Sequence, residues 1–114
     1  MAKFHTYFYK TISGKEVVIE FIDALDVDTR TKTRNGIRFL EEYGLSLIKT
    51  QWLKKVNNKP AIFELRIISK VSVRLLFVFI KPSNFLITNI FIKKTNKLPK
   101  EELAIAIKRA REFI

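Results

Sequence analysis

Residues 62–92 read IFELRIISKVSVRLLFVFIKPSNFLITNIFI, and this stretch decides the fold. It contains three segments rich in β-branched and aromatic residues, 62–68, 73–80 and 85–92, separated by short polar breaks. Because the breaks are too short to hold a crossover helix, the pattern predicts three strands in an antiparallel meander. The middle segment is apolar on both faces except at Arg74, which predicts a central strand.

The residues before this stretch predict one strand and two helices. The aromatic-rich segment 4–9 indicates a first strand. Ser13 and Glu16 have the spacing of a capping box, which predicts that a helix starts there. The Asp26/Asp28 cluster then predicts a break and a new N-cap, so the two helices should form a hairpin.

Two glycines mark the second helix. Gly44 follows Tyr43 and predicts the helix C-terminus. Gly36 lies inside the helix, where glycine is unfavourable, and we expect it to mark a close approach of the two helices.

The last element predicted is a C-terminal helix. Pro99 suits its first turn, and an apolar stripe follows at helical spacing. We therefore expect a single α+β domain over residues 1–114, in the order β-α-α-β-β-β-α. An antiparallel sheet of about four strands should pack against the helical hairpin and the C-terminal helix.

Composition narrows the class of protein. Of 114 residues, 47% are hydrophobic, ten are Phe and none is Cys, which predicts a folded domain without a disulfide framework or a cysteine metal site. No apolar run approaches the ~20 residues that a membrane-spanning helix needs. We expect a cytoplasmic protein with no membrane partner and no cofactor.

The positive charge is confined to one half of the sequence. Residues 1–48 carry seven basic and seven acidic residues. Residues 49–114 carry fifteen basic residues against four acidic ones, which accounts for the whole net charge of +11. Such a surface attracts phosphate backbones, although it would also suit solubility or an acidic protein partner.

Four short motifs together resemble a known family. They are Ile62-Phe63-Glu64-Leu65-Arg66, Val73-Arg74-Leu75-Leu76-Phe77, Phe91-Ile92-Lys93-Lys94-Thr95 and Pro99-Lys100-Glu101-Glu102. Their order and spacing are similar to the phage-derived, HigB-like branch of the RelE/ParE toxin superfamily, over nearly the whole chain. The resemblance implies a RelE-like fold and a ribosome-dependent mRNA endonuclease that acts without metal. Its partners would be the ribosome, mRNA and a small helix-turn-helix antitoxin.

The resemblance also implies a site. The catalytic candidates are Arg66, Arg74, Lys93 and Lys94, and the RNA-binding candidates are Lys54, Lys55, Glu64, Asn89 and Phe91. Arginine and lysine suit this chemistry, because attack of an RNA 2′-hydroxyl on its phosphate builds negative charge that fixed cations stabilise.

Several of these residues have a structural alternative. Glu64 and Arg66 could simply pair with each other, and Phe91 and Trp52 could be core residues rather than base-stacking ones. We expect the single histidine, His5, to be structural. Asn89 stands where relatives commonly carry His, and Asn does not transfer protons at neutral pH.

Two classes of function follow. One is the mRNA endonuclease. The other is a non-catalytic binder, either a basic nucleic-acid module or a ParE-like inhibitor of a DNA topoisomerase.

Overall fold

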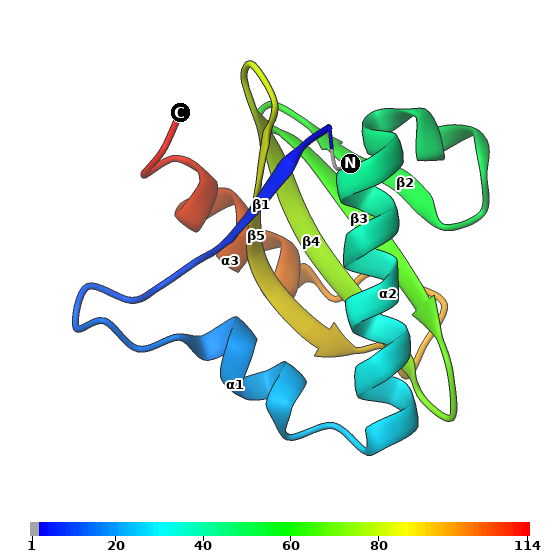
Figure 1. The fold of residues 1–114 in the computed structure, drawn as a ribbon. Helices are drawn as coiled ribbons and strands as arrows, with labels where there is room; N and C mark the ends of the chain where they lie inside the picture. Colours follow the sequence, from blue (N-terminus) through cyan, green and yellow to red (C-terminus); the bar gives the residue numbers. More distant parts are fainter. Residues whose placement is uncertain (1–2) are drawn as a thin grey trace.

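A five-stranded mixed sheet forms the middle layer of the protein in the computed structural model, which describes residues 3–114 (Figure 1). The sheet has the strand order β1-β5-β4-β3-β2. In chain order the elements are β1 (His5–Phe8), α1 (Val17–Asp23), α2 (Val27–Tyr43), the 3₁₀ helix η1 (Gly44–Lys49), β2 (Leu53–Asn58), β3 (Ala61–Ile68), β4 (Ser72–Ile80), β5 (Asn84–Ile92) and α3 (Lys100–Ala110).

The predicted meander is confirmed. Strands β3, β4 and β5 pair antiparallel with their neighbours, and β4 lies at the centre of the sheet. Its position explains why its residues are apolar on both faces.

The prediction of about four antiparallel strands was wrong in two respects. First, β2 is a fifth strand at the edge, paired antiparallel with β3. Its sequence, LKKVNN, has few apolar residues because an edge strand is largely exposed, and its lysines discourage pairing with another chain. Second, β1 pairs parallel with β5, from His5 opposite Asn84 to Phe8 opposite Ile87. Because these two strands are far apart in the sequence, no local sequence pattern indicates whether they pair parallel or antiparallel.

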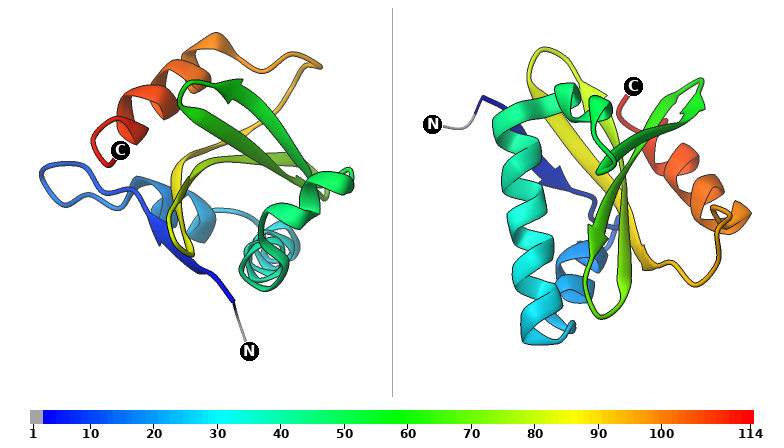
Figure 2. Two further views of the ribbon diagram at one scale, coloured as in Figure 1. Left: turned by 90° about the horizontal axis from the view of Figure 1, so that it is seen from above. Right: turned by 90° about the vertical axis from the view of Figure 1, so that its right-hand side faces the viewer.

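The helices cover the two faces of the sheet unequally. Helices α1 and α2 share one face with the larger core cluster, which includes Val18, Ile37 and Leu75. Helix α3 packs on the other face over a smaller cluster that includes Leu76 and Ala106. Figure 2 shows α2 and α3 on opposite sides of the sheet. No helix among residues 3–114 is long and apolar enough to span a bilayer.

The two ends of α2 are capped by the residues that the sequence predicted, whereas the predicted cap of α1 is absent. Asp26 caps α2 by accepting a hydrogen bond from the Thr29 N–H, and Gly44 ends the helix with φ of 60°. The predicted capping box of α1 is absent: Glu16 is its N-cap and makes no side-chain cap bond. Ser13 instead shares a hydrogen bond with Thr11, within the turn before the helix.

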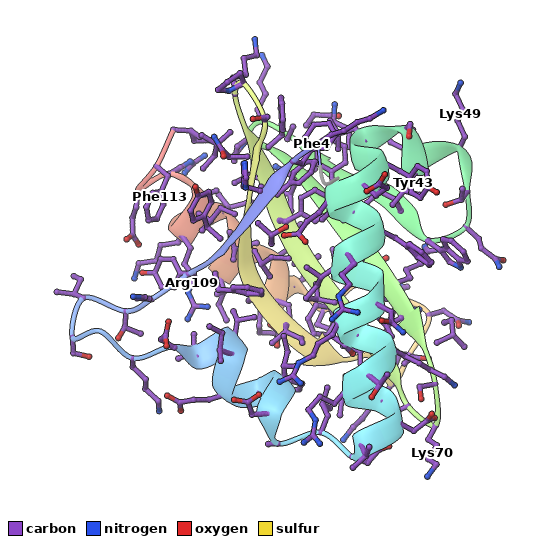
Figure 3. The ribbon with its side chains drawn as sticks, viewed as in Figure 1. Phe4, Tyr43, Lys49, Lys70, Arg109 and Phe113 are labelled. Carbon is purple, nitrogen blue, oxygen red and sulfur yellow. The ribbon has the colours of Figure 1, made fainter. Side chains whose placement is uncertain are left out.

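Phe4 ties the start of the chain to the end of α2. Its ring packs against Phe79 and Phe85, and a Cβ at Gly44 would overlap it. In Figure 3 it lies beside the C-terminal end of α2. Gly44 is therefore required both for its positive φ and for the space that the ring occupies.

At Gly36, α2 lies close to the sheet and not to the neighbouring helix α1. A Cβ at this position would overlap Cδ1 of Ile67 on β3. The expected close contact therefore exists, but the prediction of its partner was wrong. Helix α2 lies directly on the sheet, and the small residue sets how closely.

This contact predicts a strong coupling between positions 36 and 67. Gly36→Ala should destabilise the protein by up to about 1 kcal/mol, because the added methyl group must displace Cδ1 of Ile67, while the gain in helix propensity offsets part of that cost. In an Ile67→Val background the overlapping atom is gone and the next atom is 3.7 Å away. The same substitution should there be neutral, or stabilise by up to ~1 kcal/mol through helix propensity. Chemical denaturation of the four proteins measures both effects, and strictly additive effects would contradict the contact.

Candidate functional site

Glu64 is a buried carboxylate surrounded by cations. It lies on β3 with 1% of its surface exposed. Its Oε1 accepts a hydrogen bond from Arg66 Nε at 3.0 Å and lies 3.9 Å from Arg74 Nε, while its Oε2 lies 4.0 Å from Lys93 Nζ. The expected Glu64–Arg66 pair therefore exists, as part of a larger cluster. We call these four residues, Glu64, Arg66, Arg74 and Lys93, the cationic cluster.

The two arginines of the cluster are direct neighbours across the sheet. Arg66 on β3 pairs with Arg74 on β4 in the register, so both side chains project from the same face. Like charges directly opposite each other repel. Glu64 lies two residues before Arg66, on that same face, and its carboxylate reduces the repulsion.

A β-bulge in β5 brings Lys93 into the cluster. Ile87 pairs with Phe77 and Asn89 with Leu76, so Thr88 is the extra residue. Before the bulge, Phe85 and Ile87 face α1 and α2; after it, Phe91 faces α3. Without the extra residue, Lys93 would project from the face opposite to Glu64.

Burial has the largest effect on the pKa of Arg74. Removal from water lowers the pKa of its guanidinium below the usual value; the charge of Glu64 opposes this shift and that of Arg66 adds to it. The group remains protonated, as arginine does in proteins. Its Nη1 donates to the Val73 carbonyl at 3.2 Å, whereas its Nε has no hydrogen-bond partner among residues 3–114.

The cluster opens into a polar pocket of about 440 Å³. Its lining combines three residues of the cluster with the Lys94 side chain and three small polar ones, namely Arg66, Ser72, Arg74, Lys93, Lys94, Thr95 and Asn96. Three cations against the single charge of Glu64 leave an excess of positive charge, and Lys94 adds to it. A lining with this charge suits an anion such as a phosphate.

Three residues of this pocket were not predicted. Ser72 begins β4, and Thr95 and Asn96 follow the end of β5. A signal was available in the sequence, because adjacent antiparallel strands bring the start of one and the end of the next to the same edge. Polar residues at those two ends could have been grouped on this basis.

The two lysine candidates of β2 project from opposite faces of the sheet. Lys54 pairs with Glu64 in the register and so shares its face, while Lys55 pairs with Phe63 and projects from the opposite face. Both lysines are exposed. Lys54 could therefore contact a long polyanion that lies on the pocket face. Lys55 could not, because it projects from the other face.

Asn89 and Phe91 lie beneath α3 and do not reach the pocket. The Asn89 amide donates to the backbone oxygen and to Oε1 of Glu102, and the side chain is 4% exposed. Phe91 belongs to the core cluster under α3. A buried ring cannot stack on a base, so the core alternative for Phe91 is the one that the structure supports.

His5 and Trp52 lie outside the pocket. His5 is exposed on β1, at the far edge of the sheet from β3. Trp52 is 41% exposed and stacks on Phe39 of α2, with ring centroids 5.7 Å apart. Within residues 3–114, no three His, Cys, Asp or Glu side chains gather into a set that could hold a metal ion.

The cluster predicts that Glu64 contributes to stability. Glu64→Gln keeps the shape of the side chain but leaves three cations without their anion, which should cost about 3–5 kcal/mol of the free energy of unfolding. Glu20→Gln, at an exposed site on α1, is the matched control and should change it by no more than about 0.5 kcal/mol. Thermal and urea unfolding measure the difference, and equal effects of the two substitutions would show that the cluster does not depend on Glu64.

A protein-family model matches most of the chain. The model of the family described as phage-derived protein Gp49-like (DUF891) matches residues 20–111, which include α2, the whole meander and every residue of the pocket. No protein with a curated description matches the sequence. Because the match covers most of the chain, the protein belongs to the family of phage-derived Gp49-like proteins.

Proposed function

We propose that the protein is the toxin of a type II toxin–antitoxin pair and that it cleaves mRNA on the ribosome. The observation that carries the proposal is the pocket in which Arg66, Arg74, Lys93 and Lys94 converge. Membership of the phage-derived Gp49-like family is consistent with a toxin of this kind. The positive charge of residues 49–114 suits a partner rich in phosphate.

The chemistry requires fixed positive charge around one phosphate. When the 2′-hydroxyl attacks, its oxygen bonds to the phosphorus and its proton passes to water. The bond from the phosphorus to the 5′ oxygen of the next nucleotide breaks, and that oxygen takes a proton from water, which leaves a 2′,3′-cyclic phosphate. Negative charge builds on the other phosphate oxygens during this step. Arg74 is suited to stabilise that charge, since its guanidinium is buried and fixed beside Glu64. Arg66 and Lys93 are held by the same carboxylate. Because their positions are set before substrate binds, little reorganisation is needed during the reaction.

Glu64 and Lys94 have different roles in this proposal. Glu64 is buried and bound by Arg66, so its carboxylate positions the cations rather than contacting the 2′-hydroxyl. Lys94 is exposed and forms no ion pair with any residue in 3–114. Its ammonium group is free to contact the substrate. A small antitoxin protein would neutralise the toxin by covering these groups.

One observation favours a second candidate, a non-catalytic binder of nucleic acid or an inhibitor of a DNA topoisomerase. The pocket lining consists of ammonium, guanidinium, hydroxyl and amide groups and contains no imidazole. Asn89, which the resemblance places where a proton-transferring histidine would be expected, is bonded to Glu102 of α3. Cations alone bind phosphate without moving a proton, so a binder needs nothing more than this lining.

The first prediction of the proposal concerns cleavage in cells. Expression should arrest growth and create new mRNA 5′ ends inside coding regions. Arg74→Ala and Lys94→Ala should each lower the cleavage rate roughly 10²- to 10³-fold, because each removes a positive charge that stabilises the transition state. Lys97→Ala is the matched control, since Lys97 is exposed near the pocket but does not line it.

Sequencing of 5′ ends after induction separates the two functions. Growth arrest without new ends within coding regions would refute the endonuclease and support the binder. The Arg74 variant must be shown to fold, by circular dichroism and thermal unfolding, before its loss of activity is attributed to chemistry.

The second prediction concerns the salt dependence of RNA binding. If Lys94 contacts a phosphate, Lys94→Ala should make the plot of log affinity against log salt shallower, by about 0.7 for a single strand. The Lys97→Ala control should keep the slope of the original protein. Fluorescence anisotropy of a labelled RNA at several salt concentrations measures both slopes, and an unchanged slope for Lys94→Ala would remove that residue from the phosphate site.

A further inference from the structure

A second pocket, with an aromatic wall, lies between α2 and the edge of β3. It has a volume of about 190 Å³. Its lining includes the apolar residues Leu65 and Ile67 and the aromatic residues Phe39 and Trp52. Asn35 adds an amide to the lining. We call this pocket the aromatic groove. Figure 1 shows α2 in front of the sheet, with β3 extending along its side.

Trp52 is held in place and still exposed. Its ring stacks on Phe39 with an interplanar angle of 8°. Its backbone is fixed on both sides, because its N–H donates to Thr50 Oγ1 at 3.1 Å and its carbonyl accepts from the Arg66 N–H at 2.8 Å. A rigid, partly exposed aromatic ring binds another flat ring at a small cost in conformational entropy.

Arg66 joins the aromatic groove to the phosphate pocket. Arg66 is a lining residue of both cavities, and its backbone N–H donates to the Trp52 carbonyl. The two cavities therefore share one residue, near the end of β3.

The charged residues of the groove suit a ligand that carries phosphate. Its charged lining residues are Lys32 and Arg66, and no acidic side chain lines it. Lys32 forms an exposed ion pair with Asp28 at 3.3 Å, which reduces its field only slightly. The groove thus combines an apolar, aromatic interior with a basic rim, as a site for a base attached to a phosphate would.

We propose that the aromatic groove is a nucleobase subsite, in which an unpaired base stacks on Trp52 while a neighbouring phosphate of the same RNA strand lies in the cationic pocket. This inference rests on the proposed function, because it assigns a second position on the same substrate. Arg66 bridges the two positions. Single-stranded RNA is the partner whose bases are free to enter such a groove.

Trp52 reports on its own occupancy, since it is the only tryptophan in the chain. The probes are two short single-stranded RNAs of equal length and charge, one with bases and one with abasic riboses. Both carry 2′-O-methyl groups so that neither is cleaved. The RNA with bases should quench the fluorescence of Trp52, whereas the abasic RNA should bind through its phosphates and leave the fluorescence unchanged.

Substitution tests the same contact by anisotropy of labelled RNA. Trp52→Leu should weaken binding of the base-containing RNA roughly 5- to 150-fold, which corresponds to the loss of one stacked base. It should leave binding of the abasic RNA unchanged, and Trp52→Phe should recover much of the affinity. Ile48→Ala is the matched control, because Ile48 is an exposed apolar residue nearby that does not line the groove.

The outcomes separate this inference from the function on which it rests. Equal quenching by the two RNAs, or an equal loss of affinity for both in Trp52→Leu, overturns the base subsite and leaves the phosphate pocket intact. Failure of both RNAs to bind overturns the proposed function and the subsite with it. Quenching by an acidic amphipathic peptide, with no response to either RNA, overturns the subsite in favour of a protein partner.

Discussion

The burial of Glu64 among three cations is the constraint on which the functional half of this molecule depends. A carboxylate with 1% exposure requires compensation by positive charge, and Arg66 on β3, Arg74 on β4 and Lys93 just after β5 supply it. The carboxylate in turn allows two arginines to lie opposite each other in the sheet. The strands that build the core therefore also fix the spacing of the cations.

The location of the site follows from unequal coverage of the sheet. Helix α3 packs over β4 and β5 and buries Phe91 and Asn89. On the same face, Glu64 and Arg66 on β3 lie beyond its reach, where polar side chains line an open pocket. Helix α2 lies on the other face, close to the edge of β3 because of Gly36. Arg66 is thus a lining residue of a cavity on each face.

The pocket is better suited to binding charge than to moving protons. Its cations are held by a shared carboxylate, which favours stabilisation of a charged phosphate at little cost in reorganisation. The lining contains no imidazole, and the Glu64 carboxylate is fully buried. Lys94 is the exposed amine of the pocket, so its ammonium group is accessible to a ligand from solvent.

Periodicity, caps and composition are local properties, and from them the sequence predicts the meander, the central place of β4, the extent of α2 and the charge of residues 49–114. It also indicated the basic residues that converge in the pocket. Only the tertiary structure decided the parallel pairing of β1, the edge strand β2 and the face from which Lys93 projects. The physical reason is that strand direction, edge pairing and a one-residue bulge depend on distant partners, and a single extra residue at Thr88 reverses every side chain that follows it.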